Sequence, residues 1–486
     1  MNRIRKQFAP QVTYEAIQQP AESDNEDNES EVGDAASTAP QQAPFSAYEY
    51  AVFLLLGISM LWAWNMFLAA APYFYHRFQT DDWAATHYQP SILTVSTVTN
   101  LGSSFILAKL QKGASYPKRT VVSLLINIVV FTLLAFSTIF MKDVSVATYF
   151  AFLMFMVFGA SLATGINQNG VYAYVAGFGR EEYTQAIMSG QGVAGVLPCI
   201  VQIVSVLSVA PNRGGGGDND NDQDHGPASP QESSKSAFAY FITATAVSSL
   251  ALIAFTSLVK RRSHIPSLSA PSTTTNSSSN NNNDDDDDDD DDTSESNPNP
   301  KTRTISLWTL FKRLRFTALA MILCFTITMT FPVFTAQIES VHRNGESGSS
   351  SRLFDAPVFI PLAFFFWNAG DLVGRMLVLW PPLSLVHRPW GPGALLVFAC
   401  ARAAFIPLYQ LCNIRGRGAV VQSDFFYLVV VQWLFGVSNG YLGSNCMMGA
   451  GQVPAEEREP AGAFMGLMLV AGLTLGSLLS FLAAGG

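Results

Sequence analysis

The sequence predicts an all-α membrane protein, and three observations support this fold class. Across 486 residues the chain is 49% hydrophobic and only 13% charged, whereas soluble domains carry about 25% charged residues. Apolar stretches of roughly 20 residues, the length that a helix needs to cross a bilayer, recur along the chain. The charged residues are concentrated in the N-terminal tail and between these stretches. We therefore expect eleven transmembrane helices, six before a long polar insert and five after it.

The expected spans follow from apolar length. Pro198, Pro332 and Pro407 do not exclude them, because neighbouring helices can satisfy the backbone groups that a proline frees. The spans fall near residues 50–74, 90–110, 121–141, 147–175, 183–209, 237–259, 316–336, 358–380, 393–412, 425–446 and 461–482.

Polar segments set the predicted domain boundaries. We expect a disordered acidic tail (1–49), a disordered non-cytosolic loop (211–236) and a disordered cytosolic loop (261–315), because these segments lack the apolar surface that would offset the entropy of ordering them. The cytosolic loop contains nine consecutive aspartates, equal to the whole formal net charge of −9; we interpret the run as a solvated spacer. The remaining segments are an N-terminal six-helix bundle (50–260) and a C-terminal five-helix bundle (316–486), with a site between them, as transporters commonly have.

The basic residues predict the orientation. Lysines and arginines cluster between spans two and three and on both flanks of the long insert, and such loops face the cytosol. The N-terminus is then cytosolic and the C-terminus lies outside or in an organelle lumen. Arg415 and Arg417 fall on the opposite side, so the rule holds only on balance.

Asp371 and Arg375 lie inside the eighth expected span. A single charge at the centre of a bilayer costs roughly 2.5–3.5 kcal/mol on insertion scales. Asn368, Asp371 and Arg375 share one face of a helix, and the two charges can pair one turn apart. Either the pair locks this helix to a neighbour, or it marks a pathway for a polar solute.

Other spans carry further polar residues. Trp64 and Asn65 lie in the middle of the first span, where Trp64 offers a flat stacking surface. The fourth span holds Asn167, Gln168 and Asn169, which cannot all face one way, so at least one amide points to a cavity or another helix. The remaining intramembrane polar groups, which we interpret as structural, are Asn65, Gln191, Arg402 and Asn439.

Several function classes find no support in the sequence. The five cysteines show no spacing typical of a disulfide framework or a zinc site, and no basic domain with interleaved aromatics indicates nucleic-acid binding. The spans contain neither a nucleophile with its base nor a metal motif, so we expect no enzyme activity and no cofactor. A channel would line several helices with repeated polar rings, whereas the polar groups here gather at one depth.

Several segments resemble the equilibrative nucleoside transporters. The likeness runs in order through most spans and includes WNMFLAAAPYF (64–74), YTQAIMSGQGVAG (183–195), FIPLAFFFWNAGDLVGR (359–375), ARAAFIPLYQLCN (401–413) and PAEEREPAGAFMG (454–466). The resemblance implies a major-facilitator-like fold of six plus five helices and a nucleoside as the substrate. It also implies that Trp64 stacks near the nucleoside and that Asp371, Arg375 and Asn368 contact the ribose or the base.

Two departures from the family pattern matter. The glutamine of the family's fourth span aligns with Asn169 rather than Gln168, so either amide can be the one that reads the base. Ala63 stands where many relatives have proline.

We expect facilitated diffusion by a monomer that alternates access between the two sides. The six histidines lie outside the expected spans, and an adjacent arginine favours the ionised form of Asp371. Proton-coupled export from a vacuole is the alternative, if Arg375 moves away during the cycle or Glu339 titrates. The membrane can be the plasma membrane or the vacuolar membrane, and the sequence does not identify the preferred nucleoside.

Overall fold

The computed structural model describes residues 44–208, 230–263, 304–342 and 352–484. These residues belong to one compact unit, Pro44–Gly486, and they are helical apart from turns and an isolated bridge between Ile338 and Ile414. The expected disorder of residues 1–43, 211–229 and 264–303 concerns segments outside the described residues. The aspartate run is among them.

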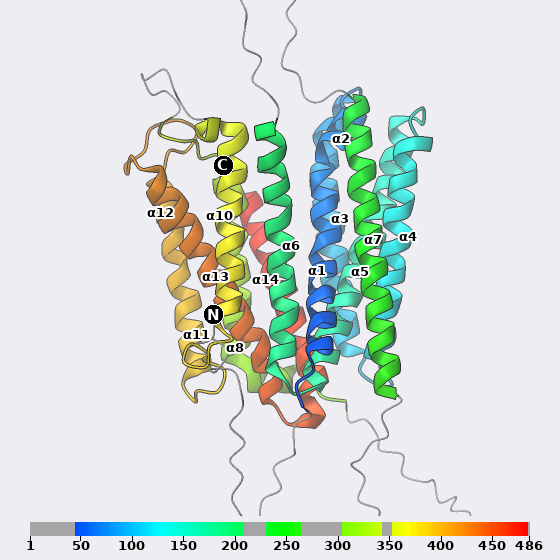
Figure 1. The fold of residues 1–486 in the computed structure, drawn as a ribbon, viewed down its shortest axis with the longest axis vertical. Helices are drawn as coiled ribbons and strands as arrows, with labels where there is room; N and C mark the ends of the chain where they lie inside the picture. The colour runs from blue at the N-terminus through cyan, green and yellow to red at the C-terminus, as the bar shows by residue number, and fades with distance from the viewer. Residues whose placement is uncertain (1–43, 209–229, 264–303, 343–351, 485–486) are drawn as a thin grey trace, which may run out of the picture. The chain divides into compact units, whose positions relative to one another are not determined.

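Fourteen α-helices form the described part of the chain, and successive long helices run in opposite directions (Figure 1). Short 3₁₀ segments and one π-helix, η3 (Phe426–Trp433), connect some of them. The α-helices are α1 (Ala47–Ala69), α2 (Ala71–Phe78), α3 (Asp82–Lys109), α4 (Tyr116–Phe140), α5 (Val146–Gly177), α6 (Glu181–Ser208), α7 (Pro230–Ser263), α8 (Leu307–Thr328), α9 (Phe331–Thr335), α10 (Ala356–Leu377), α11 (Gly391–Ala401), α12 (Phe405–Gln410), α13 (Leu434–Met448) and α14 (Arg458–Ala484).

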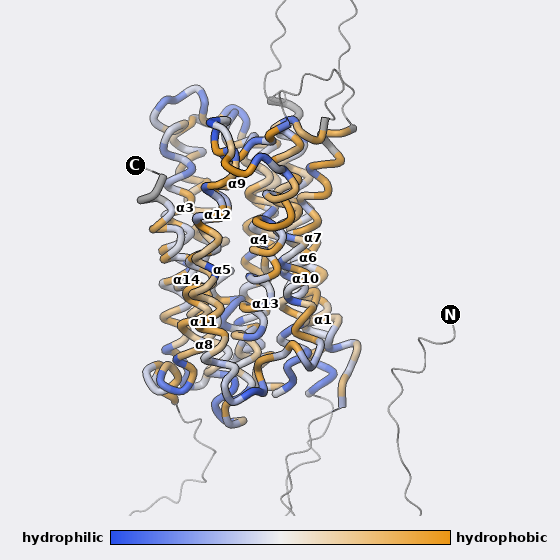
Figure 2. Tube along the Cα trace, turned by 90° about the vertical axis from the view of Figure 1, so that its left-hand side faces the viewer, coloured by the Kyte–Doolittle hydropathy of each residue, from blue (hydrophilic) through white to orange (hydrophobic). Residues whose placement is uncertain are grey.

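Ten helical stretches of the described chain are long and apolar enough to cross a membrane, which confirms a multi-span helical protein. The predicted number of eleven is not confirmed by this count. The remaining predicted span, 425–446, coincides with η3 and α13, whose change from π to α geometry divides one hydrophobic segment into two shorter helices. Hydrophobic residues dominate the middle of the helices, and hydrophilic residues gather toward their ends (Figure 2).

Several helices extend beyond the predicted spans. α8 begins at Leu307 rather than near residue 316, because the Ser306 side chain caps its first turn by accepting a hydrogen bond from the Trp308 backbone N–H. α7 begins at Pro230, inside the segment that was expected to be disordered. Two of the histidines predicted to lie outside the spans, His76 and His87, lie in α2 and α3 near their ends. Apolar length locates the membrane-crossing part of a helix but not the polar turns that continue it.

Glycines let α10 and α13 approach until their backbones touch. A Cβ atom added to Gly374 would clash with the carbonyl oxygen of Val437, and one added to Gly440 would clash with that of Asp371. Gly370 and Gly436 make the same kind of contact one turn away. This small-residue seam brings the polar residues of α13 within hydrogen-bond distance of Asp371.

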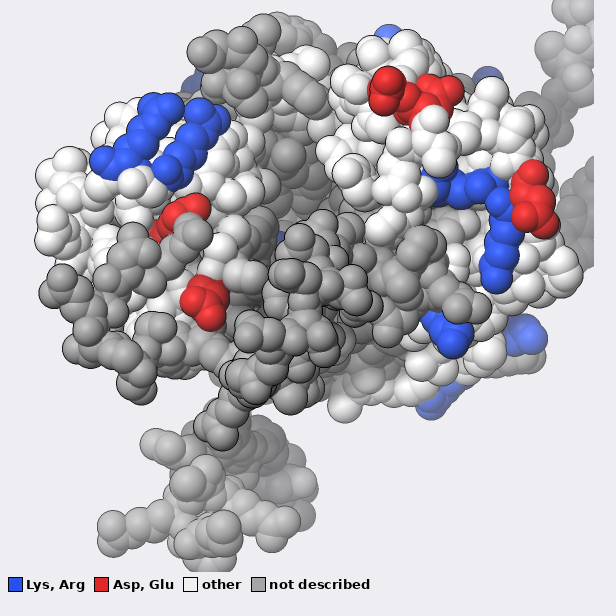
Figure 3. Space-filling model, turned by 90° about the horizontal axis from the view of Figure 1, so that it is seen from above, with Lys and Arg blue, Asp and Glu red and all other residues white. Residues whose placement is uncertain are grey.

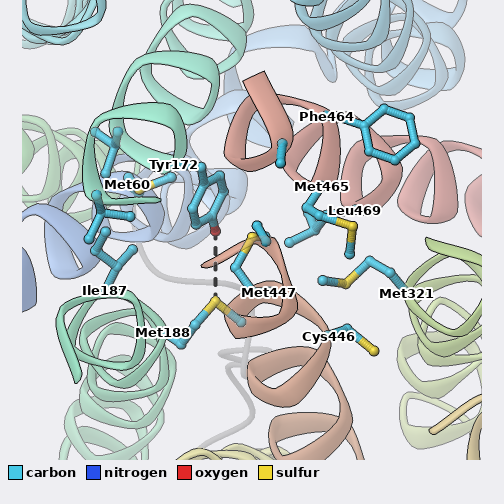
Figure 4. Packing of buried hydrophobic residues seen from close by; sticks show 14 of the residues in the cluster. Met60, Tyr172, Ile187, Met188, Met321, Cys446, Met447, Phe464, Met465 and Leu469 are labelled. Atoms are coloured by element: carbon cyan, nitrogen blue, oxygen red, sulfur yellow. Dashed lines mark hydrogen bonds between the residues drawn. The ribbon is translucent and has the colours of Figure 1, made fainter. Parts of the chain in front are cut away.

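A methionine-rich cluster lies where α1, α5, α6, α13 and α14 meet. The side chains of Met60, Met188, Met447 and Met465 are buried around Tyr172, whose hydroxyl lies 3.9 Å from the Met188 sulfur (Figure 4). Methionine is unbranched and fills irregular gaps. The cluster therefore joins N-terminal and C-terminal helices through side chains that can repack.

The seam of glycines generates the first prediction. Gly440→Ala lowers the unfolding temperature of the purified protein by several degrees, because overpacking a tight contact costs about 1–3 kcal/mol. Gly393→Ala in α11 is the matched control, since an added Cβ there meets no atom within 4 Å. Equal melting temperatures for the two variants in a detergent thermal-shift assay would contradict the close α10–α13 contact.

Candidate functional site

Asp371 and Arg375 form a buried ion pair on α10, as the sequence predicts. The Arg375 Nε donates to Asp371 Oδ2 at 2.7 Å. The two residues are 4% and 6% exposed, and a charge this deep is tolerated only when it is paired and hydrogen-bonded. The pair is one turn apart on the helix face that packs against α6 and α13.

Arg375 also binds α6. Its Nη1 donates to the carbonyl oxygen of Met188 at 2.8 Å and to Gln191 Oε1 at 3.2 Å. Gln191 Nε2 in turn donates to the hydroxyl of Tyr172 on α5 at 2.9 Å. Gly192 allows this approach, because an added Cβ would lie 3.2 Å from Arg375 Cδ. The arginine therefore connects α10 of the C-terminal helices with α6 of the N-terminal helices.

Asp371 is held from the other side by α13. The Asn439 Nδ2 donates to Asp371 Oδ1 at 2.6 Å, and Asn439 Oδ1 accepts from the Thr328 hydroxyl at 2.6 Å. Arg402, in η2 (Arg402–Ala404), donates to Thr328 Oγ1 at 3.2 Å. Three residues that the sequence marked only as intramembrane polar groups, Gln191, Arg402 and Asn439, thus belong to one hydrogen-bonded network with the ion pair.

Three other predicted residues lie one helical turn from this network, all toward the same end of the bundle. On α1, Trp64 lies four residues after Met60. The helices α5 and α10 run opposite to α1 (Figure 1). Gln168, four residues before Tyr172 on α5, and Asn368, three residues before Asp371 on α10, therefore lie toward the same end as Trp64. The Met60 sulfur lies 4.0 Å from Gln191 Nε2, which belongs to the network. The structure therefore brings Trp64, Gln168 and Asn368 to one level, above a floor formed by the network.

Polar atoms without a described partner face this level. Arg375 Nη2, Gln168 Nε2, Asn368 Oδ1 and Trp64 Nε1 form no hydrogen bond with the described residues, yet they are not among the fully buried unpaired atoms, so each keeps some exposure. Asn368 uses only its Nδ2, which donates to the Phe364 carbonyl at 2.8 Å. Three N–H donors, on Arg375, Gln168 and Trp64, and one acceptor, Asn368 Oδ1, are thus available to a ligand.

The two candidate amides of α5 are separated. Asn169 is 3% exposed and its Oδ1 accepts from Arg119 Nη1 at 2.5 Å. Arg119 also binds the carbonyl oxygens of Leu107 and Leu110, at the end of α3. Gln168 lies on the face that carries Tyr172 four residues later. The geometry therefore favours Gln168 as the amide that faces the site and gives Asn169 a role in joining α5 to the α3–α4 loop.

Asn65 has a structural contact. Its Nδ2 donates to the carbonyl oxygen of Ala194 at 2.8 Å and so joins α1 to α6. Sequence reasoning missed Tyr172, Thr328 and Cys324, which complete the network. Cys324 and Thr328 lie on one face of α8 at a spacing of four, and Tyr172 has the same spacing from Gln168. That spacing was visible in the sequence, but hydroxyl and thiol groups are common inside membrane helices and carry a weak signal.

Comparisons with known proteins identify relatives and a fold. A family model described as "Nucleoside transporter" matches residues 153–484. The chain is 28% identical over 479 residues to "Nucleoside transporter FUN26" of Saccharomyces cerevisiae, covering 91% of this chain and 85% of that protein. It is 28% identical over 483 residues to "Equilibrative nucleoside transporter 1" of Homo sapiens, covering 89% and 95%. Among solved structures, the major facilitator superfamily transporter FucP in its outward conformation matches with a TM-score of 0.53 at 11% identity, covering 91% and 94%, which shows the fold alone.

The separation of the two amides generates the second prediction. Asn169→Ala lowers the melting temperature of the purified protein, because it removes one acceptor of the partly buried Arg119 guanidinium, at a cost of about 1 kcal/mol. Gln168→Ala leaves the melting temperature near that of the parent protein, since no described residue bonds to the Gln168 side chain. A larger loss of melting temperature for Gln168→Ala than for Asn169→Ala in a thermal-shift assay would contradict the structural role of Asn169.

Proposed function

The chain belongs to the nucleoside transporter family, and on that premise we propose that it moves nucleosides across a membrane by alternating access, with the ribose bound at Asp371 and Arg375. Family and fold are those of transporters, which points away from an enzyme. The observation that carries the proposal is the set of available polar atoms above a buried ion pair.

The ion pair suits the sugar. A ribose carries neighbouring hydroxyl groups, each of which both donates and accepts hydrogen bonds. Arg375 Nη2 offers two N–H donors, and the Asp371 carboxylate, which accepts one bond on each oxygen from the protein, retains further lone pairs. Hydrogen bonds to charged groups are about twice as strong as neutral ones. The pair can therefore replace the water that the sugar loses on entering the bundle.

Trp64 and Gln168 suit the base. The half-buried Trp64 ring stacks on the Phe67 ring, with 5.6 Å between the two ring centroids. Because Trp64 lies at the level of the site, its other face is available to stack on the flat ring of a nucleobase. Gln168 offers its Nε2 as a donor to an acceptor atom on the edge of a nucleobase, whereas its Oε1 is buried. Asn368, on α10, packs against Gly195 and Cys199 of α6 and contributes an Oδ1 without a described partner. We propose that these three residues bind the base or its link to the sugar.

The contacts between N-terminal and C-terminal helices suggest which end is closed. Glu181, at the start of α6, bonds to Gln452 and lies 3.1 Å from His387 Nε2, both of which belong to the C-terminal segment. Seen from above, the opposite face carries separate clusters of basic and acidic residues (Figure 3), and the ion pair between His342 and Asp424 at that end joins two residues of the C-terminal segment. We propose that the described conformation is closed at the Glu181 end and receives substrate from the other.

The basic residues support a cytosolic location for the closed end. Lys260, Arg261 and Arg262 end α7 at the same side as the start of α1, and positive residues favour the cytosolic side. We propose a cytosolic N-terminus and a monomeric carrier in the plasma membrane or the vacuolar membrane. Facilitated diffusion is the mode that the ion pair favours, because Arg375 already supplies the positive charge that a coupled proton would otherwise bring.

The third prediction tests the ion pair. Asp371→Asn and Arg375→Lys each lower uridine uptake per inserted protein by about tenfold or more, because each removes a charge-assisted bond worth at least 1.4 kcal/mol in transport. Proteoliposomes containing equal amounts of protein provide the measurement. Asp424→Asn is the control: this carboxylate is also buried, but it binds Ser340 and His342 in a loop, so uptake stays near the parent rate. Normal uptake by both ion-pair variants would contradict the proposal.

The fourth prediction separates the two modes of transport. Uridine equilibrates across the proteoliposome membrane at the same final level with and without an inward proton gradient, because the proposed cycle carries no proton. Protein-free vesicles correct for leakage. Accumulation above the equilibrium level with the gradient alone would favour proton-coupled transport instead.

A further inference from the structure

We propose that Arg402 and Asn439, acting through Thr328, are positioning residues that aim the Asp371 carboxylate at the substrate. The inference rests on the proposed function, because it assigns roles to residues that the ribose does not touch. It explains why the bundle contains a second buried arginine in addition to the one paired with Asp371.

Arg402 is a fully buried cation with neutral partners. It is 1% exposed and donates to the Ser438 hydroxyl at 2.9 Å and to the Cys324 carbonyl at 2.7 Å. Its guanidinium also lies 4.5 Å from the centre of the Phe435 ring. No carboxylate among the described residues touches it. Burying a charge without a counter-ion is costly, so a stabilising interaction with a nearby negative charge is expected.

That negative charge is Asp371, reached through two intermediates. Arg402 Nη2 donates to Thr328 Oγ1 at 3.2 Å, Thr328 donates to Asn439 Oδ1 at 2.6 Å, and Asn439 Nδ2 donates to Asp371 Oδ1 at 2.6 Å. The Thr328 hydroxyl has one proton and two acceptors within reach, Asn439 Oδ1 and the Cys324 carbonyl at 2.7 Å. When this proton lies toward Asn439, the relay is continuous and every donor is on the side of the arginine. An ionised carboxylate only accepts hydrogen bonds, which fixes the Asn439 amide with its nitrogen toward Asp371 and its oxygen toward Thr328.

The two oxygens of Asp371 therefore have different partners. Oδ2 is bound by Arg375, which also contacts Met188 and Gln191 on α6. Oδ1 is bound through Asn439 to α13 and α8, which belong to the same C-terminal group of helices as α10. If α6 shifts relative to α10 during the cycle, the Arg375 contacts change while those from Asn439 persist. The relay of Arg402, Thr328 and Asn439 keeps the carboxylate in one orientation throughout.

The experiment measures selectivity for the sugar hydroxyls rather than activity alone. In proteoliposomes, the ratio of uridine uptake to 2′,3′-dideoxyuridine uptake reports how well Asp371 recognises the hydroxyls, and a general packing defect lowers both rates together. Thr328→Val removes the bridging hydroxyl at nearly constant shape, and Asn439→Leu removes the amide. We expect both variants to lower the ratio by about three- to tenfold, with Arg402→Lys closer to the parent ratio than Arg402→Met.

Asn445→Leu is the matched control. Asn445 is a fully buried amide on the same helix, but it binds the Tyr441 carbonyl and the Leu385 N–H, so its loss leaves the ratio unchanged even if less protein is inserted. Asp371→Asn, measured in parallel, separates the two proposals. If Asp371→Asn lowers the uptake ratio but Thr328→Val leaves it unchanged, the relay is overturned and the proposed function stands. If Asp371→Asn leaves the uptake ratio unchanged, the proposed function is overturned, and the relay with it. If Asn439→Leu does not fold, Thr328→Val alone decides.

Discussion

The structure depends on one interaction, the ion pair between Asp371 and Arg375 in the interior of a helical membrane protein. Neither charge is stable there alone, so the surrounding helices must supply partners. α6 supplies the Met188 carbonyl and Gln191, and α13 supplies Asn439. These bonds require close helix contacts, which the glycines of α6, α10 and α13 permit. The small residues in these helices are thus a consequence of the buried charges as well as a packing feature.

The same interaction links the two groups of helices that move relative to each other in the proposed alternating-access cycle. Arg375 bonds across to α6, whereas the bonds of Asp371 beyond the arginine stay within the C-terminal group. Next to the pair, where the Met188 sulfur lies 3.8 Å from Arg375 Nη1, methionines from both groups pack around Tyr172 (Figure 4). Flexible, unbranched side chains at this position allow the interface to repack without a gap. A strong local pair and an adaptable surrounding cluster are together what a carrier with one site and two openings requires.

Much of this organisation could be predicted from the sequence, and the exceptions have physical causes. Apolar length located the membrane helices, and helical spacing placed Asn368, Asp371 and Arg375 on one face. It did not locate the polar ends of α7 and α8, because capped turns outside the bilayer carry no hydropathy signal. The roles of Gln191, Arg402 and Asn439 were also out of reach, since they depend on which helices touch. Spacing along α5 showed that Gln168 and Asn169 cannot face the same way, but it left open which of them faces the site. The bond from Arg119, fifty residues earlier, to Asn169 carries no signal in the sequence.

The central claim is that a nucleoside binds above the buried pair with its sugar hydroxyls on the two charges. A cryo-electron microscopy structure of the protein with bound uridine tests this most directly. The account predicts ribose oxygens within about 3.2 Å of Arg375 Nη2 and an Asp371 oxygen, with the base between Trp64 and Gln168. Uridine bound at another depth of the bundle, with the Asp371–Arg375 pair unaltered and distant from the sugar, would contradict it.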